Sequence, residues 1–381
     1  ASQADTIFIS QKISVPTQKS DYFPHRKVTV PCDKLSVRPE SETEHMYGKI
    51  LEKRWIMKEK LTGMCHASTV LKKPDGEILA AWFGGSREGA EDTGIYLSCQ
   101  KEGEDFSAPE LMASGGEAHW NPVLFSPDGK TVFLYYKVGM QIAQWRTYVR
   151  ISEDGGRTFG REQELVPGDR GGRGPVKNKS LRLKSGRVLA PGSLEQGEWA
   201  AFADLSEDGG RTFQRSSLIR IPGLACQTQR EVKSNIPVSP QSFQNRGVIQ
   251  PTLWAEDDRN IHMLLRSSEG RIYRSDSRDG GRSWTDAAPT GPSNNNSGID
   301  AVRMEDGRVI LAHNPVGENW GERSPLSLSV SEDGGTTFRR ILNLEEGPGE
   351  YSYPAIIADG ESIILTYTYR RENIAFCRIR L

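Results

Sequence analysis

Side chains able to carry acid–base or nucleophilic chemistry stand at the starts of short apolar segments in this sequence. His66, Gln250, Asp300 and Tyr351 occupy such positions, and Asp92 ends a polar stretch beyond the first segment. Cleavage of a glycosidic bond generally uses one protonated and one ionised carboxyl group, or a tyrosine in place of one of them. We therefore take these five as candidate catalytic residues. Further candidate carboxylates at the predicted rim are Glu195, Glu198 and Glu350. A turn-capping role for either aspartate and a structural role for the histidine are the alternatives.

Arginine and aromatic side chains in the same regions fit the binding of an acidic sugar. A guanidinium group holds a carboxylate through two parallel hydrogen bonds, and an aromatic face beside an amide suits a sugar ring. The candidates are Trp120, Asn121, Asn319, Trp320, Arg266, Arg323, Arg370 and Arg371. Core packing explains each tryptophan equally well, and a solvated surface position explains each arginine taken alone.

A repeated eight-residue string indicates the elements that must position these residues. We call its copies boxes: SEDGGRTF at 152–159 and 206–213, SRDGGRSW at 277–284 and SEDGGTTF at 331–338. Their Asp-Gly-Gly core predicts a tight hairpin turn, because glycine adopts left-handed backbone angles easily. The serine and aspartate oxygens can accept hydrogen bonds from turn amides, and the final aromatic ring can pack beneath the turn. We interpret the boxes as structural.

The spacing of the boxes predicts a repeated fold. They begin at residues 152, 206, 277 and 331, and a degenerate copy lies at 100–106. Six polar turns run in phase with them, each followed by a short β-branched or aromatic segment; the turns are 75–76, 128–129, 185–186, 257–258, 306–307 and 359–360. A repeat of about 55 residues with about four strands is typical of a β-propeller. The prediction is an all-β, six-bladed β-propeller with four-stranded antiparallel blades.

Segments outside this repeat complete the predicted organisation. Residues 1–50 are expected to form an N-terminal extension or closing segment, and 51–381 the propeller. The last residues, 373–381, are the other candidate for closing the fold. The irregular stretch 222–247 either borders the ligand site or is a surface excursion. The Gly-rich stretch 168–180 is interpreted as a solvated loop.

The composition limits the classes of partner and cofactor. The formal net charge of −1 provides no basic field for nucleic acid, and no apolar run is long enough to span a membrane. The five cysteines lack metal-site spacing, so we expect no metal and no other cofactor. The start at Ala-Ser-Gln without methionine favours a processed, secreted or periplasmic protein, with a cytoplasmic location as the alternative.

The boxes on a six-fold, four-stranded repeat resemble the Asp-box (BNR) repeat superfamily of sialidases, or neuraminidases, over about residues 50–381. The resemblance implies a six-bladed propeller with its site at one end. In that family an arginine triad holds the sugar carboxylate, a tyrosine helped by a glutamate is the nucleophile, and an aspartate is the acid/base. The resemblance therefore implies a glycoside hydrolase that releases a terminal acidic sugar, sialic acid or a related keto-deoxy sugar, from a glycan.

The family's catalytic residues map only partly onto this sequence. His66-Ala67-Ser68 stands where the family has Arg-Ile-Pro, so the first arginine of the triad is absent. Gln250 replaces the helper glutamate, and Tyr351 matches the nucleophile. These departures imply a divergent branch of the superfamily.

The family's substrate contacts map with similar departures. Arg87 takes the place of a substrate-side arginine, and Glu88, Glu91 or Asp92 that of the acid/base. Residues 294–296 are all asparagine where an arginine is expected. The resulting candidate substrate contacts are Arg87, Glu88, Trp120, Asn121, Asn296, Arg323 and Arg371.

Two other functions remain open. A polysaccharide lyase on the same fold needs a histidine and a tyrosine as base and acid, which His66 and Tyr351 could supply. A propeller that only binds glycan or protein is the other alternative, although such a site more often presents aromatic than ionisable side chains. Because the first strands of a propeller run in the same direction, we expect His66, Gln250, Asp300, Tyr351 and segment 87–92 to face one pocket.

Overall fold

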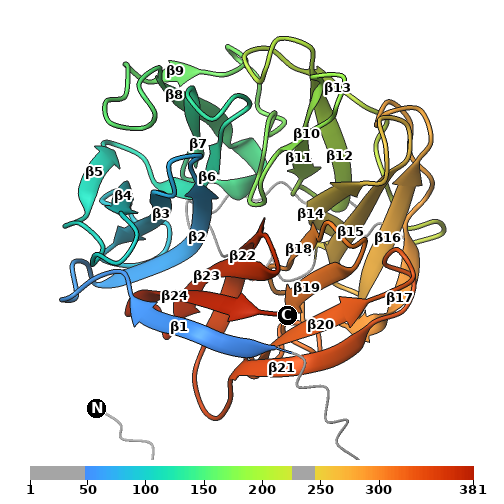
Figure 1. Ribbon diagram of the computed structural model, residues 1–381. Coiled ribbons are helices and arrows are strands. Elements are labelled where there is room, and N and C mark those ends of the chain that lie inside the picture. The colour runs from blue at the N-terminus through green and yellow to red at the C-terminus, as the bar shows by residue number, and fades with distance from the viewer. Residues whose placement is uncertain (1–47, 225–244) are drawn as a thin grey trace, which may run out of the picture. The chain divides into compact units, whose positions relative to one another are not determined.

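A computed structural model describes residues 48–224 and 245–381, and within these ranges the fold is all-β (Figure 1). The helical element found there is the short 3-10 helix η1 (Ile142–Gln144). No helix in the described part of the chain is long and apolar enough to cross a membrane. The predictions for the N-terminal segment and for the stretch 222–247 fall mostly on residues outside the described ranges.

The strands form antiparallel groups of four. Five groups run in chain order from a first to a fourth strand, and in the sixth the first described strand takes the fourth place. The first two groups are β2 (Met64–Lys72), β3 (Ile78–Gly85), β4 (Gly94–Gln100) and β5 (Glu110–Ala113), and β6 (His119–Phe125), β7 (Val132–Val138), β8 (Arg146–Ser152) and β9 (Gln163–Glu164). The next two are β10 (Leu181–Arg182), β11 (Val188–Leu194), β12 (Glu198–Ser206) and β13 (Gln214–Arg215), and β14 (Arg246–Ala255), β15 (Ile261–Ser267), β16 (Arg271–Ser277) and β17 (Ala288–Ser293). The last two are β18 (Asp300–Arg303), β19 (Val309–His313), β20 (Leu326–Ser331) and β21 (Arg339–Glu345), and β22 (Tyr351–Asp359), β23 (Ser362–Tyr369) and β24 (Asn373–Arg380) with β1 (Lys49–Trp55).

Two strand pairings connect separate parts of the fold: one joins two neighbouring groups, and the other joins the first described strand to the last. Glu198 and Trp199 of β12 pair in parallel with Arg246 and Gly247 of β14, which joins two groups into one eight-stranded sheet. Strand β1 pairs antiparallel with β24, so the first described strand and the last strand lie side by side. One sheet therefore ties together the two ends of the described fold.

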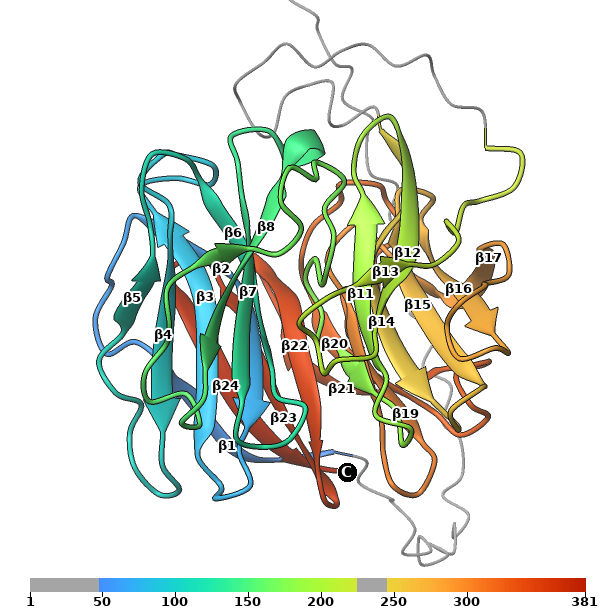
Figure 2. The ribbon, with the colours of Figure 1, turned by 90° about the horizontal axis from the view of Figure 1, so that it is seen from above.

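The turns predicted from the sequence lie where the strand order requires them. All six polar turns join a first strand to a second strand, and all four boxes join a third strand to a fourth. Because neighbouring strands are antiparallel, both kinds of turn lie at one end of the strands. The segments that enter the first strands, and the loops between second and third strands such as the one carrying η1, lie at the other end (Figure 2).

Each box is a turn closed by its own side chains, as the second copy illustrates. Ser206 Oγ accepts a hydrogen bond from the Gly210 amide (2.8 Å), and Asp208 Oδ1 accepts from the Arg211 (3.0 Å) and Thr212 (2.9 Å) amides. Gly210 has φ 102°, in the left-handed region that favours glycine. Ser206 Oγ also donates a hydrogen bond to Asp208 Oδ1 (2.6 Å), and the same serine-to-aspartate bond occurs in the other three boxes. Each terminal aromatic ring packs on a core cluster. The boxes are therefore hydrogen-bonded turns between third and fourth strands, as predicted.

Replacing Asp208 with alanine is expected to lower the free energy of unfolding by about 1 to 3 kcal/mol, because the turn amides lose their acceptor. Activity per folded molecule should be unchanged, since the boxes lie at the end of the strands away from the candidate site. Urea denaturation and the specific activity of the folded fraction measure the two quantities. A collapse of specific activity in this variant would show that the boxes do more than support the fold.

The second strands and the contacts between first strands build the core. Strands β3, β7 and β19 are buried along their whole length, which explains their nearly continuous apolar sequence. Among the first strands, β2 lies against β6 and β22, and β18 lies against β14 and β22. Figure 1 shows these first strands nearest the middle of the described fold, so the residues at their beginnings lie close together.

Candidate active site

Four first strands are interrupted near their beginnings by a residue with left-handed backbone angles. Ala67 (φ 54°), Asn121 (φ 41°), Gln250 (φ 48°) and Tyr353 (φ 54°) adopt this conformation. The pairing with the second strand shifts register at each of these points. Three of the four residues precede a proline, which has no amide hydrogen to donate to a regular ladder. Such bulges re-aim side chains and are common beside active sites.

Arg266, on β15, connects two of these bulges. Its side chain is buried, and its Nη1 donates hydrogen bonds to Gln250 Oε1 (2.8 Å) and to Tyr353 Oη (2.6 Å). Its Nε donates to Asn296 Oδ1 (2.8 Å), and its Cζ lies 5.8 Å from the centre of the Trp320 ring. The buried guanidinium attracts an anion and lies beside an oxygen that could act as a nucleophile, so this arrangement can serve both nucleophilic chemistry and carboxylate binding.

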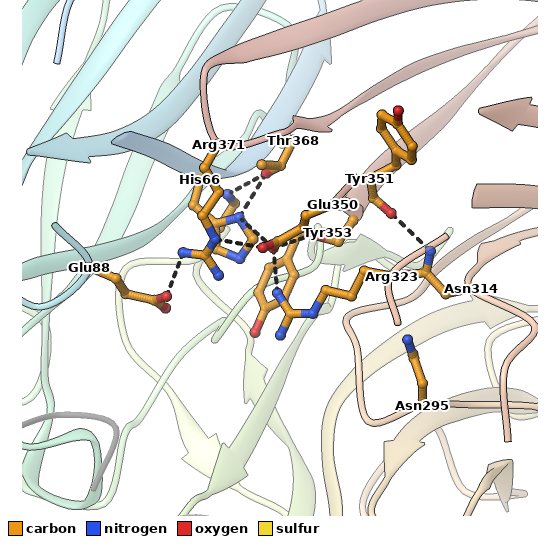
Figure 3. Close-up of polar contacts among 12 residues, drawn as sticks. His66, Glu88, Asn295, Asn314, Arg323, Glu350, Tyr351, Tyr353, Thr368 and Arg371 are labelled. Carbon is orange, nitrogen blue, oxygen red and sulfur yellow. Dashed lines mark hydrogen bonds and ion pairs between the residues drawn. The ribbon is translucent and has the colours of Figure 1, made fainter. Parts of the chain in front are cut away.

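Glu350 holds two further arginines next to Tyr353 (Figure 3). Arg323 Nη1 donates to Glu350 Oε1 (2.6 Å) and Arg371 Nε donates to Glu350 Oε2 (2.8 Å). Arg371 also donates through Nη1 to Glu88 Oε2 (2.5 Å) on the β3–β4 loop. Although burial alone raises it, the pKa of Glu350 is held well below its ordinary value, chiefly by the Arg323 charge and also by that of Arg371. Glu350 is therefore ionised at neutral pH.

His66, on β2, packs against the same tyrosine. The two ring centres are 4.2 Å apart, and His66 Nδ1 is 2.9 Å from Thr368 Oγ1. His66 Nε2 has no hydrogen-bond partner within residues 48–224 and 245–381. Burial, reinforced by the nearby Arg371 charge, lowers the pKa of His66 well below its ordinary value. The imidazole is therefore neutral at neutral pH and available as a proton acceptor.

The buried neutral state of His66 predicts an acid-labile fold. Below the ordinary pKa of about 6.5 an unfolded histidine binds a proton that His66 in the folded protein does not bind, so stability falls as the pH is lowered from about 6.5 towards 5. Replacing His66 with glutamine should reduce the slope of unfolding free energy against pH by up to about 1.4 kcal/mol per unit in this window. Denaturant titrations across this range measure the slope. Equal slopes in the two proteins would contradict the assignment.

Glu195, at the β11–β12 loop, lies behind Gln250. It accepts hydrogen bonds from Gln250 Nε2 (3.4 Å) and Ser193 Oγ (3.0 Å). Burial raises the pKa of Glu195, which favours the protonated form. Glu195 also lines a cavity of about 270 Å³, whose other walls include Trp145, Arg170, Glu198 and Arg220. A protonated carboxyl group at the edge of a cavity can act as a general acid.

The structure places Asp300 one layer deeper than these residues, contrary to the expectation that it faces the same pocket as Gln250. Its carboxylate is 1 % exposed and forms an ion pair with Lys179 Nζ (2.9 Å). It also accepts hydrogen bonds from Thr252 Oγ1 (2.6 Å) and the Ile356 amide (2.9 Å). Thr252 and Ile356 come two and three residues after Gln250 and Tyr353 along their strands. Asp300 therefore links three strands from inside the core.

Tyr351 and Asp92 also lie apart from the contacts around Tyr353. The Tyr351 hydroxyl lies 3.2 Å from Arg370 Nη2, and the centres of the Tyr351 and Tyr369 rings are 5.2 Å apart. Figure 3 shows the Tyr351 side chain turned away from Glu350. The bulge in β22 gives the position beside the arginines to Tyr353, two residues further on. Asp92 is exposed and accepts hydrogen bonds from the Ser86 amide (3.0 Å) and hydroxyl (2.9 Å), which close the β3–β4 loop.

The candidate substrate contacts divide in the same way. Glu88, Asn296, Arg323 and Arg371 join the network around Tyr353, as described above, and Asn121 lies at the bulge of β6. Arg87 is exposed on the β3–β4 loop. Trp120 is 1 % exposed, donates to the Gly139 carbonyl oxygen (2.9 Å) and belongs to a core cluster, so the core-packing alternative holds for it.

Two residues of the site were missed in the sequence. Tyr353 was not selected, although Tyr353-Pro354 repeats the residue-proline pairs of Asn121 and Gln250 at the same point of their strands. Lys177 lies in the stretch interpreted as a solvated loop, yet it is buried and donates to Asn178 Oδ1 (2.8 Å) and the Ile299 carbonyl oxygen (3.1 Å). Its Nζ is 5.8 Å from the centre of the Tyr353 ring. Burial lowers the pKa of Lys177 to about 7.

The described residues contain no cluster of three or more His, Cys, Asp or Glu side chains that could hold a metal ion. Cys65, Cys99 and Cys377 are free thiols.

Comparison with known proteins points to one family and one fold. Residues 76–365 match the family described as BNR repeat-like domain. No curated protein matches the sequence. A Dyadobacter fermentans protein of unknown function is 16 % identical with a TM-score of 0.67, and the match covers 88 % of this chain and 99 % of that one.

Several of the similar structures are sialidases. A Hadza microbial sialidase is 14 % identical (TM-score 0.66; 84 % of this chain and 66 % of that one). A Trypanosoma rangeli sialidase bound to the inhibitor DANA is 13 % identical (TM-score 0.62; 84 % of this chain and 55 % of that one). The chain thus spans just under two thirds of the first enzyme and just over half of the second. At identities this low, the structural similarity shows that the proteins share a fold.

Proposed function

Because the chain belongs to the BNR repeat-like family of the sialidase superfamily, we propose that it is a glycoside hydrolase of sialidase type that releases a terminal acidic sugar from a glycan. We further propose that its six strand groups form a six-bladed propeller at about residues 51–381, preceded by an N-terminal segment. The neighbouring first strands and the β1–β24 pairing support this arrangement.

The observation that carries the proposal is the hydrogen-bonded set of Gln250, Arg266 and Tyr353. It combines a tyrosine hydroxyl with a buried guanidinium, and residues from two other strand groups, Arg323 and His66, adjoin the tyrosine ring. A carboxylate on the sugar would bind a guanidinium through charge-assisted hydrogen bonds. This contact would hold the anomeric carbon near Tyr353, and positioning of this kind lowers the activation barrier.

In the proposed reaction Tyr353 Oη attacks the anomeric carbon and the bond from this carbon to the leaving oxygen breaks. Glu195 gives its proton to the leaving oxygen, and neutral His66 accepts the phenol proton. Water then attacks the anomeric carbon and breaks its bond to the Tyr353 oxygen. His66 returns its proton to this oxygen, and Glu195 takes up a proton from the water. This scheme gives the roles first expected for Asp300, Asp92 and Tyr351 to three other residues. They are Tyr353, His66, which packs against its ring, and Glu195, which is linked to Arg266 through Gln250.

A lyase is the second candidate, favoured by the neutral His66, whose ring packs at an angle of 48° against that of Tyr353. Here His66 would remove the proton next to a uronate carboxylate neutralised by Arg266. Tyr353 would give its proton to the departing oxygen at the neighbouring carbon. The product would contain a carbon–carbon double bond conjugated to the carboxylate.

Mass spectrometry of the products formed from sialylated, Kdo-bearing and uronate-bearing glycans tests the proposal. Hydrolysis adds one water across the cleaved bond, whereas elimination adds none and produces ultraviolet absorbance from the new double bond. A hydrolysed acidic sugar is the expected result. Binding to several glycans with cleavage of none would contradict an enzyme and favour the binding-module alternative.

A further inference from the structure

Two of the three arginines around Tyr353 already have carboxylate partners within the protein. Arg323 is paired with Glu350, and Arg371 is paired with both Glu350 and Glu88. Two positive charges therefore face two negative charges. Ser352 Oγ also donates to Glu350 Oε1 (2.9 Å), which adds a third group that fixes this carboxylate.

Arg266 has a different environment. Within residues 48–224 and 245–381 it forms no ion pair, and its hydrogen bonds go to the neutral acceptors of Asn296, Gln250 and Tyr353. The carboxylate of Glu195 is separated from it by Gln250, which bonds to both. Only 3 % of Arg266 is exposed. A buried cation without a counter-ion attracts an anion strongly.

We propose that Glu350 determines substrate specificity: it is a counter-anion supplied by the protein that occupies Arg323 and Arg371, so that Arg266 binds the carboxylate of the substrate. This inference rests on the proposed function and narrows its substrate class. The substrate is a sugar with a single carboxylate directed at Arg266. Its uncharged hydroxyl groups face the Arg323–Glu350–Arg371 ion pairs, which offer both donors and acceptors.

Glu350 can exclude a second carboxylate because it is part of the same chain. A tethered ligand acts at an effective concentration in the millimolar range, which a dilute free anion does not match. Like charges at close range also repel, so an anion that approaches Arg323 or Arg371 meets the ionised Glu350. The arginines therefore become available to a substrate carboxylate only when the charge of Glu350 is removed.

Isothermal titration calorimetry of the full chain tests the proposed role of Glu350. The two probes, used separately, are the carboxylate-bearing inhibitor DANA and free glucuronate. Glu350→Gln is expected to bind DANA about tenfold more tightly than the unmodified protein, because two guanidiniums lose their counter-ion. Glu207→Gln is the matched control and should change affinity by less than about threefold, since it removes a carboxylate paired with Arg187 in the second box, at the other end of the strands. Arg266→Gln should weaken binding of both probes by at least about tenfold.

The double variant Arg323→Gln/Glu350→Gln removes the ion pair as a unit and keeps the test decisive if Glu350→Gln does not fold. It should bind within about threefold of the unmodified protein. A loss as large as that of Arg266→Gln would show that Arg323 itself binds the carboxylate and would overturn the proposal. Unchanged or weaker binding by folded Glu350→Gln, or no binding by any of these proteins, would also overturn it. Tighter binding by Glu350→Gln with no cleavage of the glycan panel would uphold the specificity and refute the hydrolase.

Discussion

Tyr353→Phe is expected to lower kcat/KM by about 10²- to 10⁴-fold while the protein remains folded. The change removes one oxygen atom, the one that accepts a hydrogen bond from Arg266 Nη1 at 2.6 Å. Both proposed reactions need this oxygen, as nucleophile in hydrolysis and as acid in elimination. The ring remains and keeps its packing against His66, so stability should change little. Initial rates on the glycan identified by product analysis measure the loss.

Tyr351→Phe is the matched control, since it removes the same atom two residues away. The Tyr351 hydroxyl contacts Arg370 and the Pro348 carbonyl oxygen, outside the network of Arg266 and Glu350. The kcat/KM of Tyr351→Phe should stay within a few-fold of that of the unmodified protein. If Tyr351→Phe lost the activity and Tyr353→Phe retained it, the sequence match of Tyr351 to the family's nucleophile would be right and the assignment from the structure wrong.

Asp300→Asn is expected to lower the free energy of unfolding by about 3 to 5 kcal/mol, the usual cost of removing one partner from a buried ion pair. The substitution leaves Lys179 without its carboxylate partner. The NH₂ group of the new amide would also face the Thr252 hydroxyl and the Ala301 and Ile356 amides, which donate hydrogen bonds to Asp300 in the unmodified protein. Urea denaturation measures the loss.

Asp92→Asn provides the comparison at an exposed loop. Its carboxylate bonds only to Ser86 among the described residues, so the expected loss is about 1 kcal/mol. Turnover per folded molecule should be retained by both aspartate variants. A large loss of turnover in Asp300→Asn with unchanged stability would restore the catalytic role first expected for this residue.

Local sequence was sufficient to predict the turns of the fold. Ser206, Asp208 and Gly210 form their hydrogen bonds within a few residues, so the box can be read as a turn without knowledge of the rest of the chain. The regular spacing of the turns then fixes which strand is first and which is third in each group. The end of the strands that carries the site follows from this order alone.

Side-chain direction at the site could not be predicted in the same way. Regular alternation along a strand predicts that Tyr351 and Tyr353 face the same side, but the register shift between Ser352 and Ala355 breaks the alternation. The depth of Asp300 depends on Thr252 and Ile356, which are 48 and 56 residues away in sequence. The pairing of Glu350 with Arg371 likewise joins different parts of the chain, and no local pattern signals it.

The measurement that tests the central claim most directly compares an acidic glycan with the methyl ester of its carboxylate as substrates of the unmodified protein and of Arg266→Gln. If Arg266 binds the carboxylate, kcat/KM for the acid should exceed that for the ester by about 100-fold in the unmodified protein. The discrimination should largely disappear in Arg266→Gln. Equal rates on acid and ester in the unmodified protein, or discrimination that survives in Arg266→Gln, would contradict the account.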